Sequence, residues 1–364
     1  MPGPDITRPK NKGAIYSNVL RCALVAVIAV LAQPLVGRAE LDASPIQSQS
    51  TQSSTTQSQP TPVAPSAGQN PSQQQKSSDD NGTFVIRKDV DEVLLHATVV
   101  DDKQRIVTDL DKNAFTVLED GKPQAIISFR HEDIPVAMGI VIDNSGSMRE
   151  KRAKVNQAAL NLVRSSNPQD EVFVVNFNDE YYLDQDFTND LSKMREALEK
   201  VDTRGGTALY DAVVASADHL KKNARLEKRV LFVVTDGEDN ESQESLEQAI
   251  RRLQEENGPT VYAIGLLGDE KARRARKALQ FIAEKTGGIA FFPKTLDQVD
   301  EISRQVAHDI RNQYTIGYKP TNPKSTGGYR AIRVDAKAKG YGKLTVRTKS
   351  GYYAGQERAA STDK

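Results

Sequence analysis

From residue 136 onward, the apolar residues of this chain form short runs that alternate with segments of helical periodicity. The runs cover 136–142, 171–177, 229–235 and 260–265, and each is bounded by polar residues. Short apolar runs of this kind are typical of buried strands in a parallel sheet. Between them, apolar residues recur at three- and four-residue spacing, which predicts helices that include 191–201, 245–256, 271–286 and 297–312. The alternation predicts an α/β fold with a doubly wound, mainly parallel sheet.

Strand patterns without helices flank this region on both sides. Before it, strands are expected at 84–86, 93–100, 115–119 and 126–130; after it, they are expected at 314–318, 329–336 and 343–348. Each flank is too short to bury a core of its own and would leave open sheet edges. We therefore predict that an N-terminal β segment (82–132) and a C-terminal β segment (313–355) form one small β-sandwich, with the α/β domain (133–312) inserted between them.

The N-terminus has the pattern of an export signal. Basic residues precede an apolar stretch from Cys22 to Ala32, and Gly37-Arg38-Ala39 follows, which predicts a signal peptide over 1–39. The apolar core is about 11 residues long, short of the ~20 that span a bilayer. An uncleaved anchor is the alternative, because Leu35 and Val36 extend the run. Residues 40–81 are rich in Ser, Gln and Pro and predict a disordered linker, and 356–364 are a tail.

Charge limits the classes of partner. Lys and Arg total 49, Asp and Glu also total 49, and the formal net charge is +0. No overall field draws the protein to nucleic acid, and contact with a membrane is expected only if the N-terminal segment is an uncleaved anchor. The signal segment predicts a secreted, periplasmic or cell-envelope location. The sequence leaves the oligomeric state open.

Oxygen-bearing side chains follow the first apolar run of the α/β region. Asp143, Ser145 and Ser147 come directly after 136–142, Thr207 follows a Gly-Gly pair, and Asp236 directly follows the run 229–235. Because the carboxyl ends of parallel strands share one edge of a sheet, these side chains are expected to converge. Carboxylate and hydroxyl oxygens suit Mg²⁺ or a similar hard cation. The alternative is that they are turn and cap residues, since Ser and Asp favour helix N-caps.

The same motifs carry a family resemblance. The region 134–312 resembles a von Willebrand factor type A domain: Asp143-Asn-Ser-Gly-Ser147 is similar to the Asp-x-Ser-x-Ser signature of its metal-ion-dependent adhesion site, and the loops of Thr207 and Asp236 match in order. The flanks resemble a bacterial family of secreted von Willebrand-related proteins through Phe-x-Val-x-Glu-Asp-Gly at 115–121 and Tyr-x-x-Gly-Tyr at 314–318. A closing Gly-Tyr-Tyr at 351–353 adds to this, although Lys349 and Ser350 replace the expected basic stretch.

The resemblance implies a function. Ser145, Ser147 and either Thr207 or Asp143 would bind a divalent cation directly, most fittingly Mg²⁺ with Mn²⁺ and Ca²⁺ as alternatives, and the rest would act through water. A carboxylate of a protein partner would complete the coordination. We therefore expect a secreted or envelope-associated binding module rather than an enzyme. The alternatives are a metal-dependent phosphotransferase or hydrolase with Asp143 as nucleophile, a structural subunit of an envelope complex, and an intracellular ATPase partner, which conflicts with the signal segment.

A tyrosine pair and a basic run are expected to have structural roles and no role in binding. Tyr181-Tyr182 is expected to pack in the core, although an interface role is the alternative. The basic run 271–277 is expected to be the solvated face of a helix.

Overall fold

The computed structural model describes residues 92–200, 202–268 and 272–355. The predicted signal segment, linker and tail, and the strand expected at 84–86, lie outside these residues. Within the described ranges, no helix is long and apolar enough to cross a membrane.

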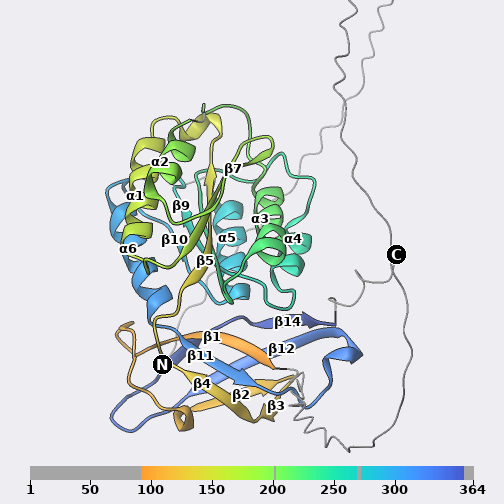
Figure 1. The fold of residues 1–364 in the computed structure, drawn as a ribbon. Coiled ribbons are helices and arrows are strands. Elements are labelled where there is room, and N and C mark those ends of the chain that lie inside the picture. Colours follow the sequence, from red (N-terminus) through yellow and green to blue (C-terminus); the bar gives the residue numbers. More distant parts are fainter. Residues whose placement is uncertain (1–91, 201, 269–271, 356–364) are drawn as a thin grey trace, which may run out of the picture. The chain divides into compact units, whose positions relative to one another are not determined.

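The α/β part of the chain is built on a mixed sheet (Figure 1). Its strand order is β10-β9-β8-β5-β6-β7. All neighbouring pairs are parallel except β6 and β7, which are antiparallel. The strands are β5 (Val136–Asp143), β6 (Glu171–Phe177), β7 (Tyr181–Thr188), β8 (Lys228–Thr235), β9 (Thr260–Gly265) and β10 (Ala290–Phe291). The predicted fold class is confirmed.

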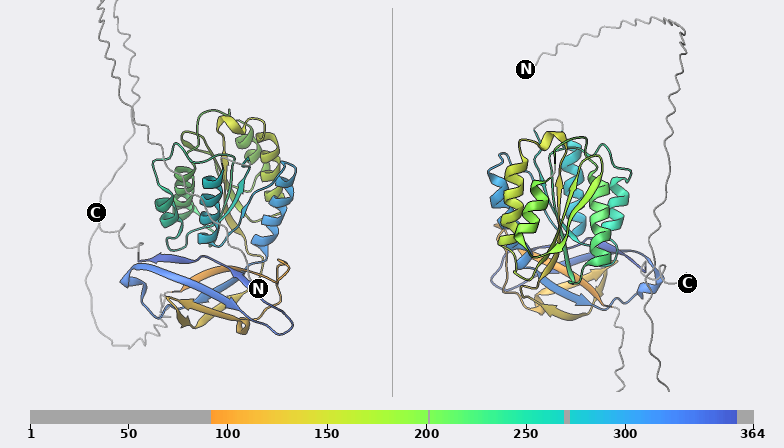
Figure 2. Two further views of the ribbon diagram at one scale, coloured as in Figure 1. Left: turned by 180° about the vertical axis from the view of Figure 1, so that it is seen from behind. Right: turned by 45° about the horizontal axis from the view of Figure 1, so that its top comes forward.

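Helices cover both faces of this sheet (Figure 2). Side chains of α1, α2 and α6 share a core with one face, and those of α3, α4 and α5 share a core with the other. The helices are α1 (Arg152–Arg164), α2 (Leu191–Glu199), α3 (Leu209–Asn223), α4 (Leu246–Leu253), α5 (Arg273–Thr286) and α6 (Gln298–Arg311). β5 lies between β6 and β8, and all its residues are buried. A Cβ at Gly139, in its middle, would come within 2.3 Å of Phe173, so only glycine fits there.

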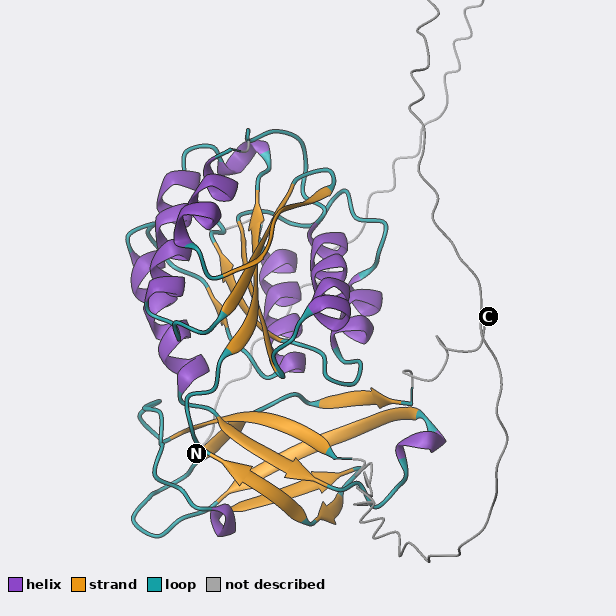
Figure 3. Cartoon of the chain, viewed as in Figure 1, coloured by secondary structure: helices purple, strands orange, loops and turns teal. Residues whose placement is uncertain are grey.

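The flanking strands form two four-stranded sheets around a shared core (Figure 3). One sheet has the order β13-β1-β11-β4 and the other β14-β12-β2-β3. The strands are β1 (Val93–Val100), β2 (Phe115–Glu119), β3 (Lys122–Gln124), β4 (Ile126–Arg130), β11 (Tyr314–Tyr318), β12 (Gly328–Ala336), β13 (Thr345–Arg347) and β14 (Gly351–Ala354). β1 pairs with β11 and β13, and β2 pairs with β12, so segments from both ends of the described chain complete each sheet.

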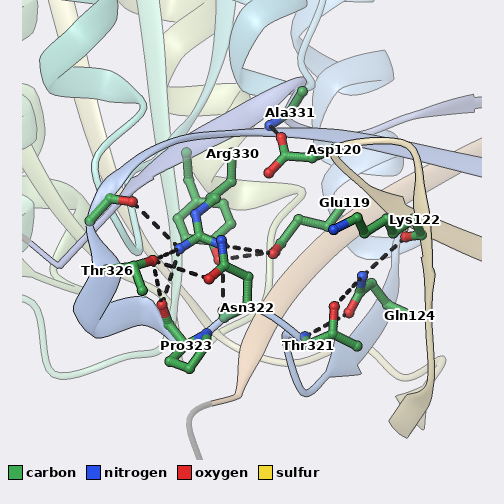
Figure 4. Close-up of polar contacts among 12 residues, drawn as sticks. Glu119, Asp120, Lys122, Gln124, Thr321, Asn322, Pro323, Thr326, Arg330 and Ala331 are labelled. Carbon is green, nitrogen blue, oxygen red and sulfur yellow. Dashed lines mark hydrogen bonds and ion pairs between the residues drawn. The ribbon is translucent and has the colours of Figure 1, made fainter.

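A buried ion pair holds the second of these sheets to the loop between β11 and β12 (Figure 4). Arg330 on β12 and Glu119 on β2 are each only 2% exposed, and Arg330 Nη1 lies 3.2 Å from Glu119 Oε1. Arg330 Nη2 also donates to the Pro323 carbonyl (3.0 Å) and to Thr326 Oγ1 (2.5 Å), in the loop between β11 and β12. The other carboxylate oxygen, Glu119 Oε2, accepts hydrogen bonds from the hydroxyls of Tyr318 (2.5 Å) and Tyr352 (3.1 Å). Both oxygens of Glu119 and both terminal nitrogens of Arg330 are thus hydrogen-bonded, as a buried ion pair requires.

The motif at 115–121 is explained by these contacts. Glu119 is the buried partner of Arg330, and Asp120 and Gly121 form the turn between β2 and β3 with positive φ angles of 49° and 77°. Asp120 Oδ1 also accepts a hydrogen bond from the Ala331 amide at 2.8 Å. A turn of this kind favours Asp-Gly, because both positions need left-handed backbone.

Polar contacts join the α/β part to the strands that follow it. Asp309 on α6 is buried, and its carboxylate accepts hydrogen bonds from the Tyr262 hydroxyl on β9 (2.8 Å) and from Arg347 Nη2 on β13 (2.9 Å). Gln254, after α4, donates to Ser350 Oγ (3.1 Å), and its carbonyl accepts the Tyr353 amide (2.8 Å). These bonds tie helices of the α/β part directly to β13 and β14.

We predict that Arg330→Met strongly destabilises the protein, because it leaves the Glu119 carboxylate buried without its counter-charge. The free energy of unfolding should fall by about 3–5 kcal/mol. Arg333→Met, on the same strand at a side chain that is 73% exposed, should change it by less than about 0.5 kcal/mol. Urea unfolding followed by circular dichroism measures both variants, and equal midpoints for the two would contradict this role of the pair.

Candidate functional site

The candidate residues lie where the direction of the sheet's connections changes. β5 and β8 are parallel neighbours, but the chain leaves β5 for α1 on one face and leaves β8 for α4 on the other. The two connections therefore diverge at the carboxyl ends of the strands. In doubly wound sheets, ligands bind in the crevice at such a point.

Asp143, the last residue of β5, is fully buried at this edge. Its Oδ1 accepts a hydrogen bond from the Ser145 amide (2.8 Å), and its Oδ2 accepts one from Thr235 Oγ1 on β8 (2.6 Å). Burial raises the pKa of the Asp143 carboxyl, the hydrogen bonds from Thr235 and Ser145 counteract the rise, and the nearby charge of Asp236 adds to it. Both oxygens of this carboxylate are therefore held in fixed positions.

Ser145, Ser147 and Asp236 continue the chain of contacts. The two serine hydroxyl oxygens are 3.1 Å apart, and Ser147 Oγ donates to Asp236 Oδ1 at 2.7 Å. Ser145 is the N-cap of the 3-10 helix η2 (Gly146–Met148), yet its side chain makes no capping hydrogen bond. The alternative interpretation as a cap residue therefore does not explain the Ser145 hydroxyl, which faces Ser147 instead.

Thr207 lies beside this group without bonding to it. A Cβ built on Gly237 would be 3.3 Å from Thr207 Oγ1, so the hydroxyl is next to the residue that follows Asp236. The Thr207 carbonyl accepts the Asn240 amide at 3.0 Å, which joins its loop to the one after β8. Among the described residues, no hydrogen bond joins the Thr207 hydroxyl to Asp143, Ser145, Ser147 or Asp236. The structure thus brings four candidates into one hydrogen-bonded group and sets the fifth alongside.

Gly205, two residues before Thr207, occupies a position that only glycine fits. Gly205 has a φ of +71°, and its carbonyl accepts the Gly146 amide at 3.2 Å, which connects this loop to the serine loop. A Cβ at Gly205 would come within 2.2 Å of the Asp179 carboxylate. A larger residue would be strained by its backbone and would push away Asp179, which accepts the Gly206 amide at 2.5 Å.

Two basic residues of the site were missed by sequence reasoning. Lys151 makes an ion pair with Asp236 Oδ2, and the Asp236 side chain is completely buried. Arg152 is also buried, and its Nη2 donates to Asn176 Oδ1 (2.9 Å) and to the Leu198 carbonyl (3.0 Å). Burial lowers the pKa of Arg152 to about 10. A signal was present: basic residues at the start of a helix oppose its dipole, so their position needs another partner.

The donor chemistry of the group is that of a hard-cation site. Among the described residues, no three His, Cys, Asp or Glu side chains are placed to hold a metal ion, so a cation here would depend on the hydroxyls. The 3.1 Å between the serine oxygens matches the separation of about 3 Å between adjacent ligands of an octahedral ion with ~2.1 Å bonds. Asp143 and Asp236 are accompanied by the two cationic side chains Lys151 and Arg152, so the fit rests on the oxygen donors and not on net charge. The residues present therefore fit a divalent cation.

A fold of this class with hydroxyl and carboxylate donors at its switch point agrees with the family comparison. Residues 138–238 match the family model of the von Willebrand factor type A domain. All five candidate residues lie within this match to a von Willebrand factor type A domain.

Individual relatives are distant. A probable bifunctional E2/E3 enzyme, R795, of Acanthamoeba polyphaga mimivirus is 27% identical over 161 residues, which are 42% of this chain and 12% of that protein. The solved PilB minor pilin of Streptococcus sanguinis aligns with a TM-score of 0.42 and 13% identity over 50% of this chain and 62% of the pilin. A von Willebrand factor type A protein of Catenulispora acidiphila aligns with a TM-score of 0.43 and 14% identity over 74% of each chain. The chain thus spans about an eighth of the length of the curated relative that it matches.

We predict that Lys151→Met destabilises the metal-free protein, because Asp236 then stays buried without its cationic partner. In EDTA, the free energy of unfolding should fall by about 1.5–3 kcal/mol. Lys154→Met, on the next turn of α1, removes an exposed ion pair with Asp297 and should cost less than about 1 kcal/mol. Chemical unfolding of both variants in EDTA measures the difference, and an equal loss in the two would show that Lys151 does not neutralise Asp236.

Proposed function

We propose that this protein is a binding module of the cell exterior or envelope, which captures an acidic group of a protein partner through a divalent cation. The observation that carries the proposal is the hydrogen-bonded group of Asp143, Ser145, Ser147 and Asp236 at the switch point of the sheet, with Thr207 beside it. Mg²⁺ suits these hard oxygen donors best, and Mn²⁺ or Ca²⁺ are the alternatives.

Each of the five residues would contribute an oxygen to the cation site. The hydroxyls of Ser145, Ser147 and Thr207 and the carboxylates of Asp143 and Asp236 would hold the cation directly or through water. A cation bound by neutral hydroxyls keeps most of its charge, so it would act as a Lewis acid towards a carboxylate that a partner brings. The outward position of Ser147 supports this, because Ser147 is exposed while Asp143 and Ser145 are buried.

The geometry favours binding over the alternative of catalysis by Asp143. A carboxylate nucleophile must reach its substrate, but both Asp143 oxygens already accept hydrogen bonds and the side chain is fully buried. A phosphotransferase of this type also needs a second acid two residues on, where this chain has Ser145. The N-terminal signal pattern supports a location outside the cytosol.

We expect Mg²⁺ or Mn²⁺ to raise the melting temperature of the wild-type protein, because a ligand that binds only the folded state stabilises it. At 100 times the dissociation constant the gain is about 2.7 kcal/mol. Asp143→Asn and Ser147→Ala should each remove most of this gain, whereas Ser192→Ala, an exposed serine of α2, should keep it. A thermal melt with and without EDTA measures the shift.

Two results would count against the proposal. If neither Mg²⁺ nor Mn²⁺ changes the melting temperature of the wild-type protein, the metal site is ruled out. Metal-dependent hydrolysis of p-nitrophenyl phosphate that Asp143→Asn abolishes would replace binding by catalysis. Retention on an immobilised glutamate-rich peptide in Mg²⁺, with release by EDTA, is the result expected for carboxylate capture.

A further inference from the structure

The outer edge of β7 is an open sheet edge. β7 ends the strand order of the α/β sheet, and no strand of the described residues pairs with its outer side. It is 8 residues long, whereas β10 at the opposite end of the sheet has only 2. An unpaired edge of this length presents a row of backbone N–H and C=O groups that can pair with another extended chain (Figure 1).

The apolar side chains of this strand are exposed. Tyr181 is 50% exposed, Tyr182 is 39% exposed and Leu183 is 47% exposed. The expectation that Tyr181 and Tyr182 pack in the core is therefore wrong. They stand on both faces of an edge strand, where Tyr181 lies opposite Phe177 and Leu183 opposite Val175 of β6. Consecutive exposed apolar residues on a sheet edge are a marker of interaction sites.

The segment of the chain that contains this strand carries charge of one sign. From 165 to 192 the sequence has no Lys or Arg, and its charged residues are Asp170, Glu171, Asp179, Glu180, Asp184, Asp186 and Asp190. Proteins commonly protect an edge strand with charges, proline or β-bulges. β7 has no lysine or proline; it carries Asp184 and Asp186, and its pairing with β6 shifts register on either side of Val174. The acidic edge repels a second copy of itself and any acidic segment, and it attracts a basic one.

We propose that β7 is a docking edge for an extended, basic segment of a partner protein with apolar residues at alternate positions. The segment would add a strand to the sheet: backbone hydrogen bonds supply affinity, and Tyr181 and Leu183 select apolar side chains. Glu180 and Asp184 attract the lysines or arginines between them. This docking needs no cation, so it stands or falls independently of the proposed metal site.

The probe for this docking is a labelled synthetic peptide of alternating lysine and valine with blocked ends, measured by fluorescence anisotropy in EDTA. Wild-type protein should bind it, and added NaCl should weaken binding. Leu183→Lys should weaken it about tenfold, because the variant replaces an apolar contact by a like charge. Ile127→Lys is the matched control, because Ile127 is also 47% exposed on an edge strand, β4 of the sandwich, and the variant should bind as the wild type does.

A second peptide separates strand addition from simple charge attraction. Methylation of alternate backbone nitrogens keeps the lysines and valines but removes strand hydrogen bonding, so this peptide should not bind. Equal binding of the two peptides, or equal binding to wild type and Leu183→Lys, would overturn the proposal. So would a dimer of the free protein in sedimentation that Leu183→Lys dissociates, because a second copy would then occupy the edge. Unchanged thermal melting of Leu183→Lys verifies that the variant is folded.

Discussion

The structure depends on supplying its buried carboxylates with hydrogen-bond donors and counter-charges. An ionised carboxylate in a protein interior must be paired or fully hydrogen-bonded. Three of them sit at decisive places: Asp143 at the end of β5, Asp309 where α6 meets β13, and Glu119 inside the sandwich. Glu119 is paired with an arginine and accepts hydrogen bonds from two tyrosine hydroxyls. Asp309 is paired with an arginine and accepts a hydrogen bond from one tyrosine hydroxyl. Asp143 is held by one hydroxyl and one amide. The carboxylate of the candidate site therefore has the weakest set of donors of the three, which supports the cation site that we propose there.

The α/β fold and its site were within reach of the sequence because their signals are local. The run ending in Asp143 reads as a buried strand, and the carboxyl-edge rule brings Thr235 and Asp236 beside it without any knowledge of contacts. The partners of the buried charges could not be found this way. Arg330 lies 211 residues from Glu119, and no periodicity links the two. The ion pair of Lys151 with Asp236 likewise depends on the turn that η2 makes, which sequence patterns do not specify.

The strand β7 was missed for a different physical reason. Strands are recognised by the alternation that burial on one face imposes, and most of β7 is exposed. Its segment, with Asp184 and Asp186 among aromatic residues, therefore resembles a loop. The sequence pattern also predicts too late an end for one helix. The prediction extends it to residue 256, but α4 ends at Leu253, shortly before the left-handed backbone of Asn257. The register of exposed elements is set by their neighbours, not by their own residues.

The hairpin between β6 and β7 makes the open edge and the candidate site parts of one surface structure. Asn178 at its tip accepts the Ala208 amide through its carbonyl at 2.6 Å, and Asp179 accepts the Gly206 amide at 2.5 Å. These two bonds enclose Thr207, so the loop that carries the threonine hydroxyl is positioned by the turn into β7. The two surfaces are therefore adjacent, although the ligands that we propose for them, a carboxylate at one and cationic side chains at the other, are opposite in charge.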